Sequence, residues 1–280
     1  MTTPDAWREL IGRRCGLAVR DAQHDVLSDL VNARMVARGV ACPATYYDLL
    51  QAERDSGGEW TELVDRLVSH ETSFFRHAPS YELLRSEVIP RLRSRPHIGG
   101  NSLAACSAGC STGEEAYSLA MTLMADDNVG GMFTVWGIDI SRRAIELARR
   151  AQYRERAVAA VPRAYRDRYL RPLSEGAGRR YEVVPALRER VRFVVANLYS
   201  PGGMVLNYDL ILCQNVLIYF APSAVSQLVA RLGARLNPGG YLLLGPGEAP
   251  GACPAGLELT NVGGVRALQR VGRTVEEVTP

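Results

Sequence analysis

Two acidic residues follow a glycine-containing turn in the segment Ala105–Leu119, which reads ACSAGCSTGEEAYSL. Gly109 and Gly113 lack a Cβ, so the backbone there can turn tightly and approach a bound ligand closely. Glu114 and Glu115 begin the helix that we expect next. The N-terminus of a helix favours binding of a phosphate group, but carboxylates at the same place would repel it. Carboxylates at this point suit a ligand that carries an amino group or ribose hydroxyls. S-adenosylmethionine has both and has no phosphate, and we predict a ligand of this kind.

An acidic side chain also closes the next apolar run. Phe133–Ile140 is typical of a buried strand, and Asp139 stands near its end. At the end of the second strand of an α/β protein, an acid usually binds the ribose hydroxyls of a nucleotide-like cofactor. The alternative is that Asp139 only caps the helix that follows Ser141. The turn, Glu115 and Asp139 occur in the order that a cofactor site requires, which favours the first interpretation.

Further polar residues follow a fully apolar run in the segment Tyr208–Phe220, YDLILCQNVLIYF. Gln214 and Asn215 come directly after the run, and Tyr219 lies four residues further on. Side chains just beyond the carboxyl end of a buried strand lie where α/β enzymes bind ligands and do chemistry. We predict that these residues line the site, with a plain core role as the alternative for Tyr219.

The segment Ser69–Arg76, SHETSFFR, joins small polar residues, two aromatics and an arginine. Its composition alone favours an interdomain joint in which Phe74 and Phe75 pack. The guanidinium of Arg76 can hold a carboxylate through two hydrogen bonds. Whether that carboxylate belongs to an acceptor or to the cofactor stays open at this level.

The elements that must position these residues follow two patterns. In residues 1–68 the apolar residues recur at helical spacing, which predicts a bundle of roughly four helices. A linker and a helix from about Ser80 to Leu92 occupy residues 69–92, and residues 93–280 then alternate between strand and helix signals. The expected strands are Leu103–Cys106, Phe133–Ile140, Val191–Ala196, Leu210–Cys213 and Tyr241–Gly245, and the expected helices are Glu114–Met124, Arg142–Gln152 and Ser223–Leu236. This alternation predicts an α/β fold, with helices on both faces of a parallel sheet.

The pattern lengthens between Tyr153 and Val191. A turn at Ser174–Gly178 and a short strand signal at Tyr181–Val184 predict an inserted helix with a small antiparallel hairpin, at about residues 154–190. Arginines outnumber acids across residues 142–192. Such a surplus suits an acidic protein surface or a nucleic acid, and the alternative is a solvated helical face.

Composition narrows the class of protein further. All 33 cationic side chains are arginine, and the formal net charge is +3. No apolar run reaches the ~18–20 residues that span a bilayer, and the polar N-terminus lacks the apolar region of a signal peptide. We therefore expect a cytoplasmic protein without direct membrane insertion. Of the six cysteines only Cys106 and Cys110 are close, so we expect no bound metal.

Taken together, five motifs resemble one enzyme family. The motifs ETSFFR, AGCSTGEEAYSLAM, GIDIS, ANL and CQNVLIYF, in this order and behind a helical region, are similar to the chemotaxis-receptor glutamate methyltransferases of the CheR type. The resemblance covers nearly the whole chain. It implies a Rossmann-like class I S-adenosylmethionine-dependent methyltransferase fold with a small N-terminal all-helical domain and an inserted antiparallel β-subdomain.

The resemblance also implies roles for individual residues. The family's cofactor contacts fall on Thr72, Arg76, Glu115, Asp139, Asn197, Leu198 and Asn215, and Arg76 and Tyr219 match the pair that flanks the transferring methyl group. His70 and Gln214 are further cofactor-binding candidates, at positions where the family usually has Asn and Arg. Another departure is Gly245–Glu248, GPGE, where the family commonly has Gly-His-Ser-Glu.

The implied reaction transfers the methyl group of S-adenosylmethionine to a glutamate γ-carboxylate of a chemoreceptor and leaves S-adenosylhomocysteine. The family docks its receptor on the inserted subdomain, so the expected partners are the cytoplasmic helices of a methyl-accepting chemoreceptor. We expect a monomer and no nucleic-acid partner, since RNA-binding signatures are absent from the sequence. Two alternatives remain: a methyltransferase of RNA or of a small molecule, and a non-catalytic S-adenosylmethionine-binding module.

Overall fold

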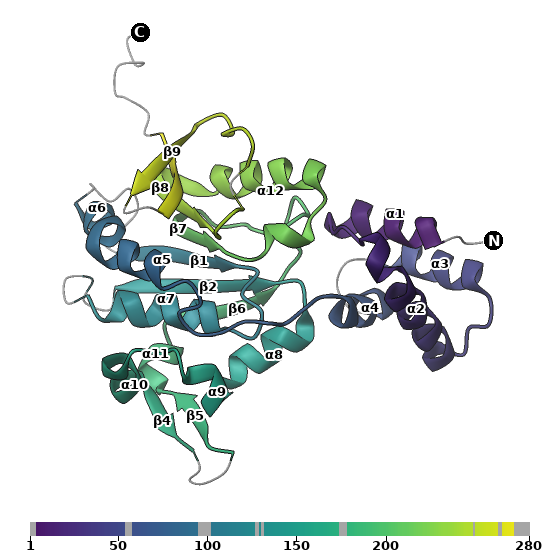
Figure 1. The fold of residues 1–280 in the computed structure, drawn as a ribbon, viewed down its shortest axis with the longest axis horizontal. Coiled ribbons are helices and arrows are strands. Elements are labelled where there is room, and N and C mark those ends of the chain that lie inside the picture. The colour runs from purple at the N-terminus through teal and green to yellow at the C-terminus, as the bar shows by residue number, and fades with distance from the viewer. Residues whose placement is uncertain are drawn as a thin grey trace.

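The computed structural model describes residues 4–53, 58–94, 102–126, 129, 132–173, 178–248, 250–262 and 265–271. Figure 1 shows a helical lobe at the N-terminal end, a central sheet between helices, and a small second sheet at the margin. No helix among the described residues combines the length and the apolar character that crossing a membrane requires.

The N-terminal lobe is all-helical, as the periodicity predicts. It contains α1 (Pro4–Cys15), the 3-10 turn η1 (Asp21–Gln23), α2 (His24–Arg38), α3 (Pro43–Ala52) and α4 (Glu59–Leu67). These helices enclose a core of their own, whose largest members are Trp7, Tyr46 and Trp60. Gly39 ends α2 with a φ of 66°, a conformation that glycine adopts without a steric penalty.

The helix expected from Ser80 to Leu92 is interrupted. It consists of α5 (Ala78–Leu83), a π-helical turn η2 (Leu84–Val88) and α6 (Ile89–Arg93). Pro90 has no backbone N–H, and its ring would clash with the carbonyl four residues earlier in a regular α-helix. The wider π turn before it accommodates that clash.

The central sheet has seven strands in the order β6-β2-β1-β7-β8-β10-β9. The strands are β1 (Leu103–Ala108), β2 (Phe133–Asp139), β6 (Val191–Val195), β7 (Tyr208–Cys213), β8 (Leu236–Leu244), β9 (Leu257–Val262) and β10 (Val265–Arg270). The five predicted strands pair in parallel, whereas β10 is antiparallel to both of its neighbours. The sequence prediction missed β9 and β10, because these strands mix polar and apolar residues and lack the continuous apolar run of the inner strands.

Helices cover both faces of this sheet. One face packs on α5, α6, α7 (Glu114–Met124) and α8 (Arg142–Arg150), and the other on α12 (Pro222–Ala234). The short α11 (Pro185–Arg188) precedes β6. The helix expected to reach Gln152 ends at Arg150, because Ala151 takes a left-handed conformation with a φ of 55°.

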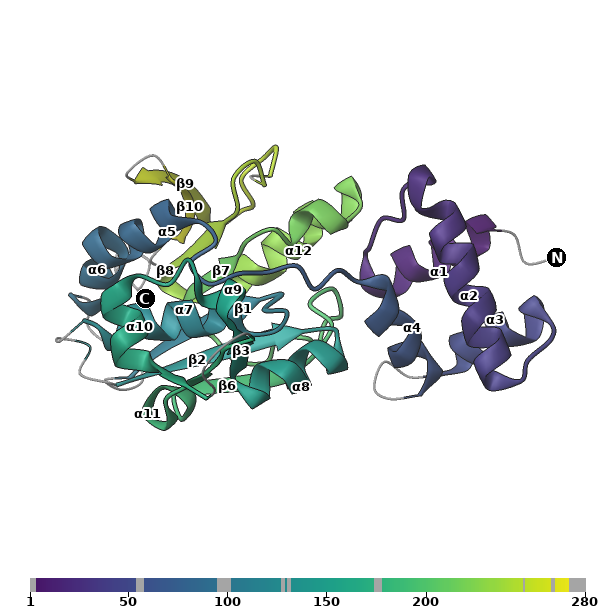
Figure 2. The ribbon, with the colours of Figure 1, turned by 60° about the horizontal axis from the view of Figure 1, so that its bottom comes forward.

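The predicted insertion is a three-stranded antiparallel sheet. It contains β3 (Gln152–Arg154), α9 (Glu155–Val158), α10 (Arg163–Tyr169), β4 (Leu170–Pro172) and β5 (Arg180–Val183), with β5 in the middle. The sequence prediction missed β3 and one of the two helices. Figure 1 shows this subdomain below the central sheet, and in the turned view of Figure 2 its helices α9 and α10 lie in front of the sheet, away from the N-terminal lobe.

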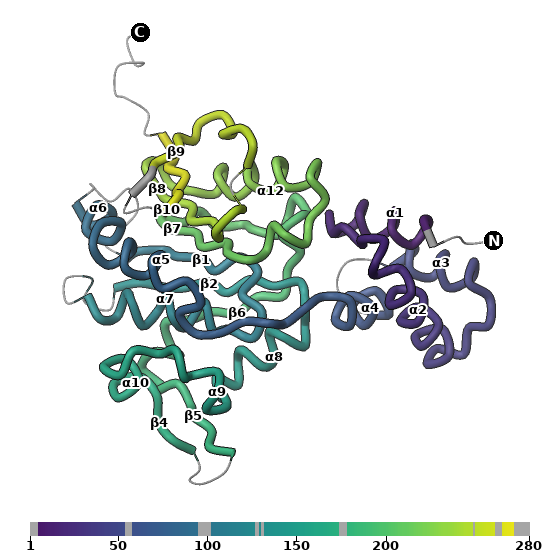
Figure 3. Tube along the Cα trace, in the orientation of Figure 1, coloured from purple at the N-terminus to yellow at the C-terminus, as the bar shows by residue number. Residues whose placement is uncertain are grey.

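The N-terminal lobe meets the carboxyl ends of the central strands. Asp65 at the end of α4 accepts a hydrogen bond from Ser141 Oγ at 2.5 Å, and Ala18 N donates to the carbonyl of Tyr219 at 2.8 Å. The chain then crosses from α4 to α5 in an extended linker (Figure 3). The strand ends are therefore enclosed by the helical lobe, the linker and the loops of the sheet itself.

Candidate active site

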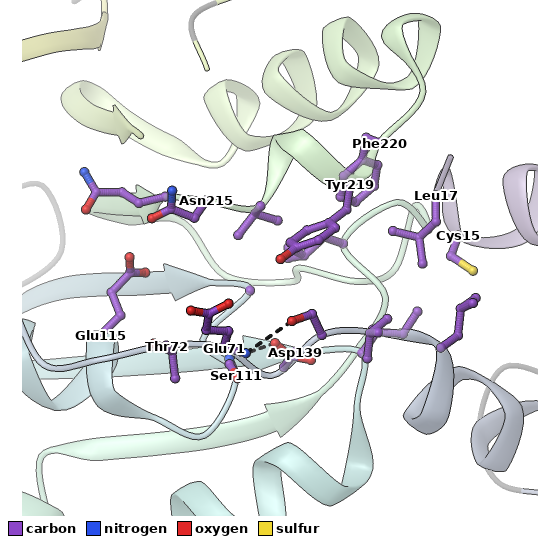
Figure 4. Close-up of a pocket in the computed structure, with 18 of the residues that line it drawn as sticks. Cys15, Leu17, Glu71, Thr72, Ser111, Glu115, Asp139, Asn215, Tyr219 and Phe220 are labelled. Carbon is purple, nitrogen blue, oxygen red and sulfur yellow. Dashed lines mark hydrogen bonds between the residues drawn. The ribbon is translucent and has the colours of Figure 1, made fainter. Parts of the chain in front are cut away.

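A pocket lies at the carboxyl ends of β1, β2, β6 and β7, where the N-terminal lobe closes over the sheet. It encloses about 1310 Å³ of empty space, counting the part that opens to solvent. It brings together nine of the ten residues proposed from sequence: Thr72, Arg76, Glu115, Asp139, Asn197, Leu198, Gln214, Asn215 and Tyr219. In Figure 4, Glu115 and Asn215 lie at one end, Leu17 and Cys15 at the other, and the Tyr219 ring projects into the space between them.

The linker contributes Thr72 and Arg76. Phe74 is fully buried and Phe75 nearly so, and the backbone N–H of Phe75 donates to Ser118 Oγ on α7 at 3.0 Å. The two aromatics thus anchor the linker, as the joint interpretation predicts. Arg76 remains exposed, and its Nη1 donates to the carbonyl of Glu71 at 3.0 Å.

Glu115 stands in the first turn of α7, and its remaining accessible surface faces the pocket. Ser107 Oγ donates to its Oε1 at 2.7 Å, and no described residue donates to its Oε2. Burial raises the pKa of Glu115 to about 7, with a further rise from the charge of Glu248 and opposing effects of the Ser107 hydroxyl and Arg76. This carboxylate is therefore an under-compensated acceptor, which suits a cationic ligand group.

Asp139 braces the glycine-containing turn. Its Oδ2 accepts from the backbone N–H of Ser111 at 2.8 Å and its Oδ1 from that of Ser141 at 2.9 Å. Burial raises its pKa despite these two hydrogen bonds. Ser141, with its own side chain, caps α8 by accepting from Ala144 N. Asp139 thus links the turn after β1 to the end of β2, and each of its oxygens keeps a lone pair for a ligand.

The turn after β1 is conformationally strained. Ser111 has a φ of 47°, which costs a residue other than glycine about 1–3 kcal/mol. Gly109 and Gly113 also have positive φ values, and a Cβ on Gly109 would lie 2.5 Å from Val216. Only glycine fits at Gly109, in agreement with the close backbone approach that the sequence predicts.

The residues after β6 connect the site to the N-terminal lobe. Asn197 Nδ2 donates to the carbonyl of Arg14 at 2.8 Å, and its Oδ1 accepts from Tyr199 N at 2.9 Å. Leu198 is buried and presents apolar surface to the pocket. The side-chain amide of Asn197 is thus already committed to holding the lobe.

The residues after β7 form the opposite wall. Gln214 is 8% exposed, and its Nε2 donates to Ser80 Oγ at 2.7 Å and to the carbonyl of Leu244 at 3.3 Å. Its Oε1 accepts no hydrogen bond from a described residue. Asn215 has a φ of 57°, so the backbone strain recurs on this side of the pocket.

Tyr219 lies in the 3-10 turn η3 (Leu217–Tyr219) and is 39% exposed. The exposed fraction and the pocket lining exclude a plain core role. Its carbonyl accepts from Ala18 N, and Ala221 N donates to the carbonyl of Gly16. The segment after α1 thus pairs with the turn that carries Tyr219.

The structure does not bring His70 into the pocket. Its ring Nε2 lies 3.3 Å from the carbonyl oxygen of Asp65, and its own carbonyl accepts from Ser111 Oγ at 3.2 Å. It reaches the strained turn through its backbone, whereas the sequence suggested a direct side-chain contact.

Two parts of the site escaped the sequence prediction. The segment from Cys15 to Val19 lines the pocket, and no local signal reveals a contact with residues 200 positions later. Glu248 is buried behind the pocket wall. Its place just after a buried strand, like that of Gln214, was the signal that could have found it.

The fold and the site define an S-adenosylmethionine-dependent methyltransferase. The pocket lies across the ends of parallel strands, and the Glu115 carboxylate with its raised pKa lies at one end of it. Comparison with known families agrees with this class. The chain belongs to the CheR methyltransferase family: the family's S-adenosylmethionine-binding domain matches residues 70–255, and its all-alpha domain matches residues 5–68.

Curated relatives carry the same assignment. The chain is 30% identical to the chemotaxis protein methyltransferase Cher2 of Pseudomonas putida, over 89% of this chain and 91% of that protein. It is 30% identical to chemotaxis protein methyltransferase 1 of Pseudomonas aeruginosa, over 88% and 89%. It is also 32% identical to the probable biofilm formation methyltransferase WspC of the same species, over 92% of this chain but 61% of that protein.

Among solved structures, the chain is similar to magnesium protoporphyrin IX methyltransferase from Synechocystis with bound S-adenosylmethionine. The TM-score is 0.39 at 16% identity, over 78% of this chain and 88% of that one. This likeness is too distant to support an argument about residues or substrate.

Proposed function

We propose that this protein uses the described pocket to transfer a methyl group to glutamate γ-carboxylates on the cytoplasmic helices of a chemoreceptor. The observation that carries the proposal is the convergence of Arg76, Glu115, Asp139 and Tyr219 on one cavity from four separate elements. The family and its chemotaxis relatives support the acceptor class. The chain would act in the cytoplasm as a monomer.

The cofactor roles follow from the hydrogen-bond acceptors and the apolar surface that the pocket offers to a ligand. Glu115 Oε2 would accept from the amino group of S-adenosylmethionine, Asp139 would accept from its ribose hydroxyls, and Leu198 would cover apolar surface of its base. The remaining candidates are Thr72, Arg76, Asn197, Gln214 and Asn215, while His70 would act through its carbonyl on Ser111. We also propose that domains divide the chain at residues 1–68, 69–92 and 93–280.

The chain's own residues would act mainly by positioning. When bound, S-adenosylmethionine supplies a methyl group activated by its sulfonium charge. The acceptor carboxylate, with an ordinary pKa near ~4.3, is already ionised at neutral pH and needs no general base. Arg76 would orient that carboxylate and Tyr219 would wall the pocket beside it, because in-line attack requires the reacting atoms about 3–3.5 Å apart.

The inserted subdomain would dock the receptor. Arginines gather on α10, β4 and β5, and several of them, including Arg163, Arg168 and Arg171, are exposed. An acidic stretch of receptor would complement this charge.

The direct test incubates the purified chain with methyl-tritiated S-adenosylmethionine and receptor-containing membranes from the source cell. Label in the receptor band that base releases as methanol identifies a carboxyl ester. Base-stable label would point to methylated nitrogen or RNA instead, and binding without transfer on any receptor would point to a non-catalytic module.

A second test addresses the cofactor. Asp139→Ala should weaken S-adenosylhomocysteine binding in calorimetry, while Asp29→Ala on the exposed face of α2 should leave it unchanged. Unchanged affinity in the Asp139 variant would reduce Asp139 to a brace for the turn.

A further inference from the structure

Glu248 is a buried carboxylate that no assigned role explains. It is 5% exposed, lies four residues after the end of β8, and forms no ion pair with any described residue. A buried charge without a cationic partner is costly unless hydrogen bonds replace its hydration. The hydrogen bonds that Glu248 accepts therefore indicate its role.

Three backbone N–H groups supply those hydrogen bonds. Oε2 accepts from Asn215 at 2.7 Å and from Gly245 at 2.9 Å, and Oε1 lies 3.3 Å from the backbone nitrogen of Ile218. A Cβ on Gly245 would lie 2.1 Å from Oε2. The carboxylate can reach these donors only because residue 245 is glycine.

Two of these three donors, Asn215 and Ile218, lie in the loop after β7 that forms one wall of the pocket. Asn215 lines the pocket in a left-handed conformation, and the hydrogen bond from its backbone N–H to Glu248 holds it there. Ile218 sits directly before Tyr219 in the 3-10 turn. One side chain thus ties the ends of β7 and β8 together and holds the turn that presents Tyr219.

Glu248 also acts on Glu115 across the wall through its charge, which adds to the rise in the pKa of Glu115. The other titratable or charged groups that interact with Glu115 are Arg76, Tyr81, Cys106, Cys110 and Cys213. Among these groups Arg76 is the cation and opposes the rise, whereas the acid Glu248 reinforces it. Removing the charge of Glu248 should therefore move the titration of Glu115 to lower pH.

We propose that Glu248 is a positioning residue for methyl transfer: its carboxylate fixes the backbone of Asn215 and of the turn that carries Tyr219. This inference rests on the proposed function of the pocket. It assigns a role to a residue that is not among those lining the pocket.

Two substitutions separate geometry from charge. Glu248→Gln removes the charge and replaces one acceptor oxygen by a donor group. Gly245→Ala displaces the carboxylate but keeps its charge. Glu146→Gln, at an exposed position of α8, is the matched control.

We expect both Glu248→Gln and Gly245→Ala to lower kcat by about tenfold or more at little change in KM for the receptor, since small misplacements are costly in positioned reactions. The pH profile of S-adenosylhomocysteine affinity should shift to lower pH in Glu248→Gln, because a charge that raises the pKa of Glu115 is lost. Glu146→Gln should change neither quantity. Wild-type turnover in Glu248→Gln overturns the proposal.

A measurement on the wild type covers the case in which a variant fails to fold. The amides of Asn215, Gly245 and Ile218 should exchange slowly in hydrogen-exchange experiments, as expected for donors to a buried carboxylate, and rapid exchange would overturn the proposal. This outcome is independent of activity. A wild-type protein that protects these amides but neither binds S-adenosylhomocysteine nor methylates a receptor would refute the proposed function alone.

Discussion

Two glutamates of this chain differ in how their charge is compensated. Glu59 lies in the N-terminal lobe, and Glu115 lies in the pocket. Glu59 is 3% exposed. Arg34 donates to both of its oxygens at 2.7 Å, and Tyr46 Oη donates to Oε1 at 2.7 Å. Glu115 receives one hydrogen bond, from Ser107. One carboxylate is satisfied by its fold, and the other is left for a ligand to satisfy.

The two pKa shifts express this difference. Burial works to raise the pKa of Glu59, but the hydrogen bonds from Arg34 and Tyr46 outweigh it, and the net pKa is lowered. For Glu115 burial prevails, and the pKa rises to about 7. Glu59 therefore contributes stability above its unfolded pKa that is lost as the pH falls. Glu115 contributes stability at low pH that is lost as the pH rises through about 7. In this pair, the sign of the pKa shift distinguishes the acid that the fold pairs from the acid that faces the pocket.

The largest expected effect comes from breaking the Glu59 network. Arg34→Met leaves a buried carboxylate without its bidentate partner, which costs about 3–5 kcal/mol in comparable pairs. Urea unfolding should show a loss of this size in the free energy of unfolding. Arg66→Met, which removes an exposed pair with Glu62, should cost less than about 1 kcal/mol. An equal, small loss in both variants would show that the buried Arg34–Glu59 pair stabilises the fold no more than the exposed Arg66–Glu62 pair.

The second-largest expected effect concerns Arg76, the arginine that lines the pocket. Arg76→Ala should lower methyl transfer by at least ~10²-fold, because the acceptor loses its orientation. Stopped assays with receptor membranes measure this, and Arg91→Ala, whose partner is Glu87 on an exposed helix face, is the control. Near-normal turnover in the Arg76 variant would reject its catalytic role.

Neutralising Glu115 should stabilise the ligand-free protein but weaken its binding of the cofactor. Glu115→Gln removes a charge whose ionisation opposes folding, so the free energy of unfolding of the ligand-free protein at pH 8 should rise. Cofactor affinity should fall by about 30-fold, as for a lost hydrogen bond to a charged group. Thermal unfolding and calorimetry measure the two quantities. A variant that loses stability at pH 8 would mean that Glu115 is a structural acid like Glu59.

The smallest effect requires no substitution. A ligand that binds only the ionised form of Glu115 should lose affinity by up to about tenfold between pH 8 and pH 6, because protonation competes with it. Calorimetric titration of S-adenosylhomocysteine at several pH values measures the slope. A flat profile would show that Glu115 is already ionised throughout, and Glu115→Gln should abolish any slope that exists.

The outcome of the sequence predictions differs between elements for physical reasons. α7 begins and ends where expected, at Glu114 and Met124, because its capping turn and apolar periodicity are local. The five inner strands were found because their apolar runs reflect burial on both faces. β9 and β10 were missed because a half-exposed edge pair carries a weaker pattern. The π turn at Leu84–Val88 depends on how one proline is accommodated, which periodicity does not reveal.

For the site, residue types and order pointed to Glu115, Asp139, Gln214, Asn215 and Tyr219, since strand ends in an α/β fold meet at one edge. The family resemblance added Thr72, Arg76, Asn197 and Leu198, which the pocket also contains. His70 was the exception: its ring nitrogen lies 3.3 Å from the carbonyl oxygen of Asp65 in α4, and the residue does not line the pocket. Glu248 and the segment around Leu17 were overlooked for a related reason. Their roles consist of contacts with residues far along the chain.

By itself, the sequence determined which residues can do chemistry, which family the chain resembles, and the order of elements that carries them. Those properties depend on side-chain type and local spacing, which the chain carries wherever it folds. Only the tertiary structure decided the state of each acid: that Glu59 is paired, that Glu115 is left open to a ligand, and that Glu248 is held by three backbone amides. Charge compensation depends on which groups come within a few ångströms, and packing between distant segments decides that.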